Sequence, residues 1–273
     1  MTSAGTPYAE VIGDPISHSK SPLIHRFWLA ALGIDGDYRA HAVTDAGLAD
    51  YVATRAADPA WRGCNVTIPH KLAIMDLVTD PGDIRGSIGA MNTILRQPDG
   101  TLIGTNTDAA GFAAPIAEAD LAGADVAVIG AGGAARAVLF ALARLGVGSV
   151  TLYNRTPLKA AGLLARFGLK GEVRPLGAPL PPVALVVNTS ALGMTGQPPL
   201  EIDLTPLPDD AIVYDIVYAP LETPLLAQAR ARELATVDGL EMLIGQAALA
   251  FELFFGAAPP RDRDADLRQL LLA

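Results

Sequence analysis

The sequence predicts an α/β protein of two domains, each built from a sheet with helices packed against it. The main observation is that segments typical of strands alternate with helix-forming segments along almost the whole chain. In the second half of the chain the strands are nearly continuous in their hydrophobicity, as expected of a parallel sheet covered on both faces. The length of 273 residues, with 51% hydrophobic residues, is enough for two ordinary domains with buried cores.

The elements of the first half follow from apolar runs and the turn residues between them. Strands are predicted at 8–13, 37–43, 63–68, 92–96 and 101–105, and helices at 23–32, 46–57 and 70–78. The last two strands form a predicted hairpin, because Pro98, Asp99 and Gly100 between them are a turn signal. A helix at 109–119 is expected to link the two domains.

The second half repeats the alternation. Strands are predicted at 125–130, 149–154, 172–176, 184–188, 211–216 and 235–237, and helices at 134–145, 157–167 and 224–234. The final helices, 240–255 and 265–272, have no strand after them, so we expect them to return to the first domain. The predicted domains are therefore 1–108 with 239–273, and 109–238.

Composition narrows the classes of function. The net charge of −9 and the charged fraction of 18% argue against nucleic-acid binding. Cys64 is the single cysteine, no apolar run reaches transmembrane length, and the first residues lack the features of a signal peptide. We expect a cytoplasmic protein with no membrane partner. The four histidines lack ligand spacing with the cysteine, so no metal is predicted.

Residues 126–137, V-A-V-I-G-A-G-G-A-A-R-A, join a strand to a helix through glycines. Gly130 would permit the tight turn, while Gly132 and Gly133 would let backbone approach a pyrophosphate that faces the first amides of the helix. Ala135 stands where the third glycine of G-x-G-x-x-G would be. We interpret the loop as a dinucleotide site of a Rossmann-type domain; the alternative is an ordinary tight turn.

The end of the next predicted strand indicates which dinucleotide is bound. An acidic residue that would take the ribose hydroxyls is absent, and Asn154, Arg155 and Thr156 stand there, with Lys159 one turn later. An arginine can pair with a 2′-phosphate in a planar fork, so NADP is favoured over NAD. The alternative is a surface arginine at a helix start.

A second group of polar residues lies in the first half. Ser19 and Ser21 can point one way in an extended loop, and two hydroxyls beside a helix N-terminus suit a carboxylate. The alternative for Ser21 is an N-cap before Pro22.

Strand ends supply further candidates, with Asn65 and Thr67 at the end of the third strand and Asn92 and Asn106 around the hairpin. Lys71 is predicted at a helix start, where the dipole disfavours a positive charge. Asp108 precedes the linking helix, and its alternative is an N-cap. Together a lysine and an aspartate could share a proton with a substrate hydroxyl.

These segments in combination resemble the shikimate dehydrogenase family. They occur in family order from residue 11 to about residue 251 and read G-D-P-I-S-H-S-K-S-P-L-I-H, G-C-N-V-T-I-P-H-K, G-A-M-N-T, G-T-N-T-D-A-A-G, G-A-G-G-A-A-R-A-V, N-R-T, N-T-S-A-L-G-M, Y-D-I-V-Y-A-P-L-E-T-P-L-L and D-G-L-E-M-L-I-G-Q-A-A-L-A-F. The resemblance implies an α/β substrate-binding domain, a Rossmann-type NADP-binding domain and an active site in the cleft between them. The implied reaction is the NADPH-dependent, reversible reduction of 3-dehydroshikimate to shikimate, a step toward chorismate and the aromatic amino acids.

The resemblance also implies roles for individual residues. Lys71 and Asp108 would be catalytic, with Lys71 as the proton carrier. The substrate would be bound by Ser19, Ser21, Thr67, Asn92, Tyr218 and Gln246, of which the two serines and the tyrosine face its carboxylate. The cofactor would be held by Gly130, Ala131, Gly132, Gly133, Ala134, Ala135, Asn154, Arg155, Thr156, Lys159, Asn188, Thr189, Ser190, Ile216, Gly239 and Met242.

Some alternatives stay open. A quinate or aminoshikimate oxidoreductase would share the same frame, and a catalytically silent NADP-binding regulator would share the cofactor site. Lys159 stands where many family members place a second arginine, so phosphate pairing there would be weaker. Either a monomer or a homodimer is expected.

Overall fold

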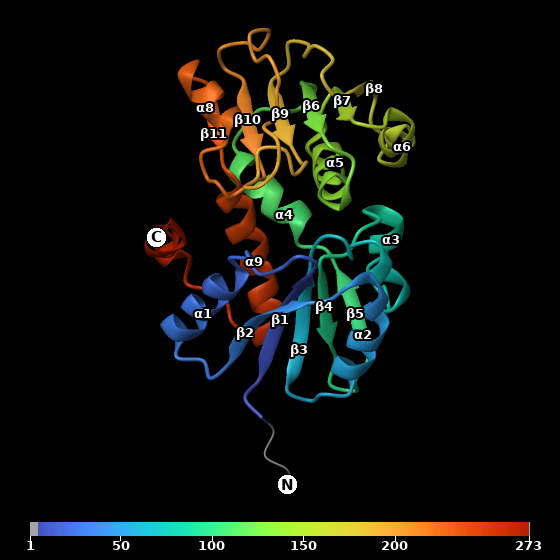
Figure 1. Cartoon of the computed structure of the whole chain (residues 1–273), viewed down its shortest axis with the longest axis vertical. Helices are drawn as coiled ribbons and strands as arrows, with labels where there is room; N and C mark the ends of the chain where they lie inside the picture. Colours follow the sequence, from blue (N-terminus) through green and yellow to red (C-terminus); the bar gives the residue numbers. More distant parts are fainter. Residues whose placement is uncertain (1–4, 273) are drawn as a thin grey trace. The chain divides into compact units, whose positions relative to one another are not determined.

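The computed structural model describes residues 5–272, which form two compact units (Figure 1). Within this range, unit 1 contains residues 5–107 and 246–272, and unit 2 contains Asp108–Gly245. The chain leaves unit 1 after Thr107 and returns to it within helix α9 (Gly239–Phe255). Each unit has its own sheet and helices, so the predicted α/β fold class is confirmed.

Unit 1 contains a five-stranded sheet in the order β2-β1-β3-β4-β5. The strands are β1 (Tyr8–Gly13), β2 (Asp37–Ala42), β3 (Trp61–Val66), β4 (Thr93–Arg96) and β5 (Leu102–Thr105). β1, β2 and β3 are parallel, whereas β4 and β5 are antiparallel and form the hairpin that the turn signal predicts. Its α-helices, besides the end of α9, are α1 (Ser21–Leu32), α2 (Leu48–Ala56), α3 (Ile84–Ser87) and α10 (Asp264–Leu272).

Unit 2 contains a six-stranded, entirely parallel sheet in the order β11-β10-β9-β6-β7-β8. Its strands are β6 (Asp125–Ile129), β7 (Ser149–Asn154), β8 (Gly171–Pro175), β9 (Leu185–Asn188), β10 (Ile212–Asp215) and β11 (Ala235–Val237). Its helices, besides the start of α9, are α4 (Asp108–Ala113), α5 (Gly133–Leu145), α6 (Pro157–Ala160), α7 (Leu163–Arg166) and α8 (Pro224–Ala231).

The core of unit 2 lies on both faces of its sheet. Val126 and Val128 of β6 belong to one hydrophobic cluster, while Ala127 and Ile129, which alternate with them, belong to another. Successive side chains of a strand point to opposite faces, so both faces are covered. This arrangement explains why the central strands β6, β9 and β10 are mostly apolar, whereas the edge strand β8 is largely exposed.

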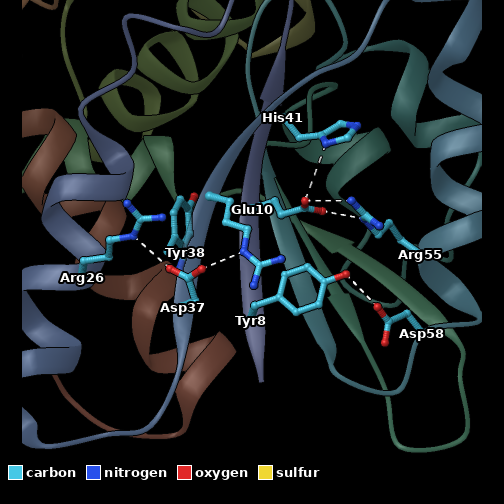
Figure 2. Close-up of polar contacts among 9 residues, drawn as sticks. Tyr8, Glu10, Arg26, Asp37, Tyr38, His41, Arg55 and Asp58 are labelled. Carbon is cyan, nitrogen blue, oxygen red and sulfur yellow. Dashed lines mark hydrogen bonds and ion pairs between the residues drawn. The ribbon is translucent and has the colours of Figure 1, made fainter. Parts of the chain in front are cut away.

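Charged side chains are paired across the sheet of unit 1 (Figure 2). Glu10 on β1 is 2% exposed, and Arg55 of α2 donates hydrogen bonds of 2.7 and 2.9 Å to its two oxygens. The Tyr51 hydroxyl donates another at 2.7 Å. Asp37 on the neighbouring strand accepts hydrogen bonds from Arg26 and Arg39. A buried carboxylate is tolerated when it is paired in this way, so these bonds allow an acid inside the sheet.

Three predicted helices differ from those in the structure. Residues 70–78 contain only a 3₁₀ turn, Ala73–Asp76, because the Lys71 carbonyl accepts a hydrogen bond from the Met91 amide instead of closing a helical turn. Residues 157–167 form two short helices that separate at Gly162, the N-cap of α7. The linking helix α4 ends at Ala113 and continues as a 3₁₀ turn at Ala114–Ile116, in which Pro115 cannot supply a helical amide.

His25 of α1 is fully buried in an aromatic cluster of unit 1. Its ring stacks on that of Tyr38, with centroids 3.8 Å apart and an interplanar angle of 8°, and Trp28 meets it edge-on. Neither ring nitrogen has a hydrogen-bond partner among the described residues. Burial lowers the pKa of this histidine to about 3, so it is neutral in the folded protein at neutral pH.

His25 therefore makes the stability of unit 1 depend on pH. Above pH 6.5 the ring is neutral in both states, but between pH 6.5 and about 3 only the unfolded state takes up the proton. The free energy of unfolding should fall by about 2 kcal/mol between pH 7.5 and pH 5 from this group alone. Chemical denaturation at both pH values checks this. The decrease in the free energy of unfolding from pH 7.5 to pH 5 should be about 2 kcal/mol smaller in His25→Phe than in the wild type.

The exposed His18 offers a matched control, since His18→Gln should keep the pH dependence of the wild type. Parallel stability curves for wild type and His25→Phe would contradict the assignment.

Candidate active site

The loop between β1 and α1 carries the two predicted serines. Ser21 is the first residue of α1 and is buried, and the N-cap position belongs to Lys20, which makes no side-chain cap. The N-cap alternative for Ser21 is therefore wrong. Instead the Ser19 hydroxyl accepts a hydrogen bond from the Ser21 amide at 3.3 Å, which leaves its own proton available to a ligand.

Lys20, between the two serines, is held by the end of the chain. Its ammonium donates a hydrogen bond to the Leu271 carbonyl in the last turn of α10, where a cation is favourable. The guanidinium of Arg263, just before α10, lies over the Phe27 ring of α1, 4.9 Å from its centroid. The terminal helix thus fixes the serine loop, and both α10 and the part of α9 from Gln246 onward belong to unit 1.

The loop after β3 meets the loop after β1. The Thr67 amide donates a hydrogen bond to the Ile12 carbonyl at 2.9 Å, and the Asp14 amide donates to the Ile68 carbonyl at 3.1 Å. Lys71 follows in a turn, half-buried, with its backbone bonded to Met91. Lys71 is not at the start of an α-helix, so the predicted conflict with a helix dipole does not exist.

Asn92, Thr107 and Gln246 form a buried polar cluster in unit 1, with exposures of 2%, 4% and 7%. Asn92 Nδ2 donates to Thr107 Oγ1 at 3.0 Å, and the Thr107 amide donates to Asn92 Oδ1 at 2.7 Å. Gln246 Oε1 lies 3.5 Å from Asn92 Nδ2 and 3.4 Å from Thr107 Oγ1. Three distant parts of the sequence are brought together here.

Thr107 was missed by the sequence analysis, although it stands between Asn106 and Asp108 in a run of polar residues. The side chain of Asn65, a candidate at the end of the third predicted strand, is bonded inside the protein. It lies inside β3, accepts a hydrogen bond from the Tyr38 hydroxyl at 2.6 Å and donates to Thr93 Oγ1 at 3.0 Å. Thr93 in turn donates to Asn92 Oδ1 at 3.0 Å, so Asn65 is connected to the polar cluster through Thr93.

In unit 2, the glycine loop connects β6 to α5. Gly130 has φ +104°, and a Cβ atom on it would lie 2.8 Å from Thr189 Oγ1. Only glycine suits this position, which confirms its role in the turn. Gly132 has φ −85°, and a Cβ atom on it would meet nothing within 4 Å, so the fold itself does not require glycine there.

The open space beside Gly132 fits a dinucleotide. No side chain caps α5, and the amides of Gly133, Ala134 and Ala135 lie in its first turn, where helix geometry leaves amides without an internal acceptor. Such a terminus favours phosphate. Ala131 is half-buried within the loop, and Ala135 is fully buried, as a tight contact of helix with sheet requires.

The end of β7 presents the residues predicted to hold the 2′-phosphate. Arg155, Thr156 and Lys159 are exposed, and Asn154 Nδ2 donates to the Thr156 carbonyl at 2.9 Å, which shapes the turn. The sequence analysis gave no role to Arg136, a half-buried cation in the first turn of α5. Burial, followed by the charge of Arg166, lowers the pKa of Arg136, so this end of unit 2 favours an anion.

The ends of β9 and β10 supply the other predicted cofactor residues. Asn188 and Thr189 are buried and their side chains bond to protein groups, while Ser190 is half-buried. Gly239 lies so close to the chain after β10 that a Cβ atom would fall 2.5 Å from the Ile216 carbonyl oxygen. Met242 packs in the core of unit 2.

Asp108 and Tyr218 also belong to unit 2. Asp108 is the first residue of α4 and is 5% exposed. Tyr218 follows β10, and burial raises the pKa of its phenol, so it stays a hydroxyl donor. Across residues 5–272, no group of three His, Cys, Asp or Glu side chains could hold a metal ion, and no helix is long and apolar enough to cross a membrane.

Two family models match the chain. Residues 11–94 match the model of the shikimate dehydrogenase substrate binding domain, and residues 239–266 match the model of the shikimate 5′-dehydrogenase C-terminal domain. A protein of Sphingopyxis alaskensis named shikimate dehydrogenase (NADP(+)) is 73% identical over 269 residues, 98% of each chain.

Solved structures are similar over the same length. Shikimate 5-dehydrogenase of Thermus thermophilus, in complex with NADP(H) and shikimate, is 35% identical with a TM-score of 0.86, covering 97% of this chain and 100% of that one. Quinate dehydrogenase of Corynebacterium glutamicum, in complex with NAD, is 29% identical with a TM-score of 0.84, covering 97% and 99%.

The two glycines of the loop should respond differently to a methyl group. Gly132→Ala should change the free energy of unfolding by no more than about 1 kcal/mol. It should weaken NADPH binding about tenfold, because the methyl group occupies the space that the phosphates would take. Gly130→Ala should instead destabilise the protein by about 1–3 kcal/mol through backbone strain. Fluorescence titration measures the affinity for NADPH, and chemical denaturation measures stability. Unchanged NADPH affinity in Gly132→Ala would contradict the placement of the phosphates beside this glycine.

Proposed function

The chain belongs to the shikimate dehydrogenase family, and from this premise we propose how its own residues serve the reaction. It is an NADP-dependent oxidoreductase that interconverts shikimate and 3-dehydroshikimate. The observation that carries this conclusion is the 73% identity, over 98% of both chains, with a shikimate dehydrogenase (NADP(+)). Such a reaction needs a substrate site and a dinucleotide site. The polar cluster of unit 1 would serve as the first, and the glycine loop of unit 2 with the first turn of α5 would serve as the second.

We propose that unit 1 binds most of the substrate. The Ser19 and Ser21 hydroxyls would donate to the substrate carboxylate, because the Ser19 oxygen already accepts from a backbone amide and its proton remains to be given. Asn92 and Gln246 would bind ring hydroxyls with Thr67, and Thr107 holds both amides in place. The Tyr218 hydroxyl of unit 2 would also donate to the carboxylate.

The reaction needs a proton carrier at the reacting oxygen. When shikimate is oxidised, the hydroxyl proton must leave as the carbinol hydrogen departs as hydride, and in the reverse direction the oxygen must regain a proton. We assign this proton to Lys71 Nζ. Asp108 would accept a hydrogen bond from the neighbouring substrate hydroxyl and so orient the ring. Positioned acid–base help of this kind contributes about 10²–10⁴-fold.

Bound NADP supplies or accepts the hydride. The first turn of α5 would hold its pyrophosphate, and Arg155 and Lys159, with Asn154 and Thr156, would hold its 2′-phosphate. We add Arg136 to that end because it is a half-buried cation in the same turn of α5. The loops that carry Asn188–Ser190, Ile216, Gly239 and Met242 would face the ribose and nicotinamide.

The proposal also covers location, oligomeric state and substrate preference. We propose a cytoplasmic location, supported by a single cysteine, Cys64, that is buried as a free thiol. A monomer or a homodimer is expected. The Corynebacterium glutamicum quinate dehydrogenase has a similar fold. A comparison of substrates would therefore reveal whether this chain prefers quinate or aminoshikimate to shikimate.

Initial rates with shikimate, quinate and an amino analogue, each with NADP and NAD, test the function. The rate should be highest with shikimate and NADP. The preference for NADP should be at least about tenfold, the value of one charge-assisted phosphate contact. Arg155→Asp is the control variant for the cofactor and should move the ratio toward NAD. Binding of NADPH without turnover of any of the three acids would favour the regulator instead.

Lys71→Ala tests the proton carrier. Turnover should fall by about 10²–10⁴-fold, because no other group would carry the proton at that oxygen. The dissociation constant of NADPH should stay within about twofold of wild type, the scatter expected for a change away from its contacts. The exposed Lys170 gives the matched control, and Lys170→Ala should leave both quantities unchanged. Undiminished turnover in Lys71→Ala would remove this lysine from the chemistry.

A further inference from the structure

A buried carboxylate lies beside the two loops of unit 2 that are proposed to face the nicotinamide. Asp215 is the last residue of β10 and is 0% exposed. It forms no ion pair with any residue between 5 and 272, and burial raises the pKa of its carboxyl. Since an unpaired buried carboxylate is costly, its presence here needs a physical reason.

Three hydrogen-bond donors from three segments converge on Asp215. Oδ1 accepts from Asn188 Nδ2 at 2.9 Å and from the Val217 amide at 3.0 Å. Oδ2 accepts from Thr223 Oγ1 at 2.7 Å. Asn188 ends β9, Val217 follows β10, and Thr223 is the N-cap of α8. The carboxylate thus joins the ends of two neighbouring strands to the start of a helix.

Only a group that accepts hydrogen bonds at both ends fits these donors. An asparagine with its oxygen toward Asn188 and Val217 would turn its amide toward Thr223, whose oxygen already accepts from the Leu226 amide. The Thr223 hydroxyl, which is fully buried, would then lose the acceptor for its proton. The opposite orientation would set the new amide against two donors. A carboxylate avoids both conflicts.

The hydrogen bonds continue from Asp215 into both loops. Asn188 Oδ1 accepts from the amide and the hydroxyl of Ser190 at 3.0 and 2.7 Å, and Asn188 Nδ2 also donates to the Leu192 carbonyl at 3.0 Å. Its polar atoms are therefore fully used inside the protein. On the other side, the bond to the Val217 amide fixes the chain between Ile216 and Tyr218.

We propose that Asp215 is a positioning residue for the cofactor: without touching it, the carboxylate sets the shape of the loops 188–192 and 216–218 that face the nicotinamide and its ribose. This inference rests on the proposed function, because it takes NADP as the ligand. The adenosine end has separate supports in α5 and at the end of β7, so the two halves of the cofactor should respond independently to a change at Asp215.

Asp215→Asn tests this independence with two probes, NADPH and adenosine 2′,5′-bisphosphate, which lacks the nicotinamide half. The dissociation constant of NADPH should rise about tenfold, because loops that the carboxylate no longer holds must be ordered again when the nicotinamide half binds. That of the bisphosphate should stay at the wild-type value, since its contacts are proposed at the other end. A merely structural role would weaken both ligands together, and KM for NADP should rise in parallel with the NADPH constant.

Two further variants keep the test decisive. Thr223→Val removes one donor without changing the buried volume much, so a smaller rise confined to NADPH is expected even if Asp215→Asn does not fold. Asp203→Asn is the matched control. The Asp203 carboxylate is exposed and accepts hydrogen bonds from nearby Thr205, so this variant should leave both probes unaffected. Equal losses for both probes, or an unchanged NADPH constant in the folded variants, would overturn the proposal. Failure of the proposed function would show separately, as no turnover of shikimate by the wild type.

Discussion

Polar groups buried at the ends of the strands must be paired with other protein groups, and this constraint shapes the proposed site residues of both units. In unit 1 the Asn92 carboxamide is fixed by Thr107, which also contacts Gln246. In unit 2 the Asp215 carboxylate is fixed by Asn188, Val217 and Thr223. Groups that are already held in place lose little entropy when a ligand arrives, so the pairing that stabilises the fold also prepares it for binding.

The glycines meet the opposite need, which is to keep side chains away. Gly130 and Gly239 are glycines for reasons internal to the fold, since a Cβ atom on either would collide with a neighbouring loop. Gly132 faces open space, so the fold itself does not require a glycine there, and the space beside it is left for the proposed pyrophosphate.

Much of the fold could be predicted because its local signals agree with its packing. The central parallel strands of unit 2 are mostly apolar on both faces, and the bounds of β7 and β11 agree with the predicted strands. The predicted helix at 70–78 was wrong because the Lys71 carbonyl accepts a hydrogen bond from the amide of Met91, which is distant in sequence. Other residues could not be interpreted because their roles depend on their neighbours in space. Asn65 could not be distinguished from a ligand-binding amide without Tyr38 and Thr93 beside it. Asp215 was overlooked because a buried carboxylate is recognised only by the donors around it.

The bond between the Lys71 carbonyl and the Met91 amide explains both the missing helix and the place of the lysine. In a helix over 70–78 that carbonyl would accept from an amide four residues later, and the Lys71 side chain would be set by the helix axis. Here the Met75 amide donates to Leu72 instead, which tightens the turn, and the Lys71 backbone is joined to the residue before Asn92. The proposed proton carrier must stay at a fixed distance from the groups that would orient the substrate. The backbone bond from Met91, the residue before Asn92, to the Lys71 carbonyl sets this distance more directly than the end of a separate helix would.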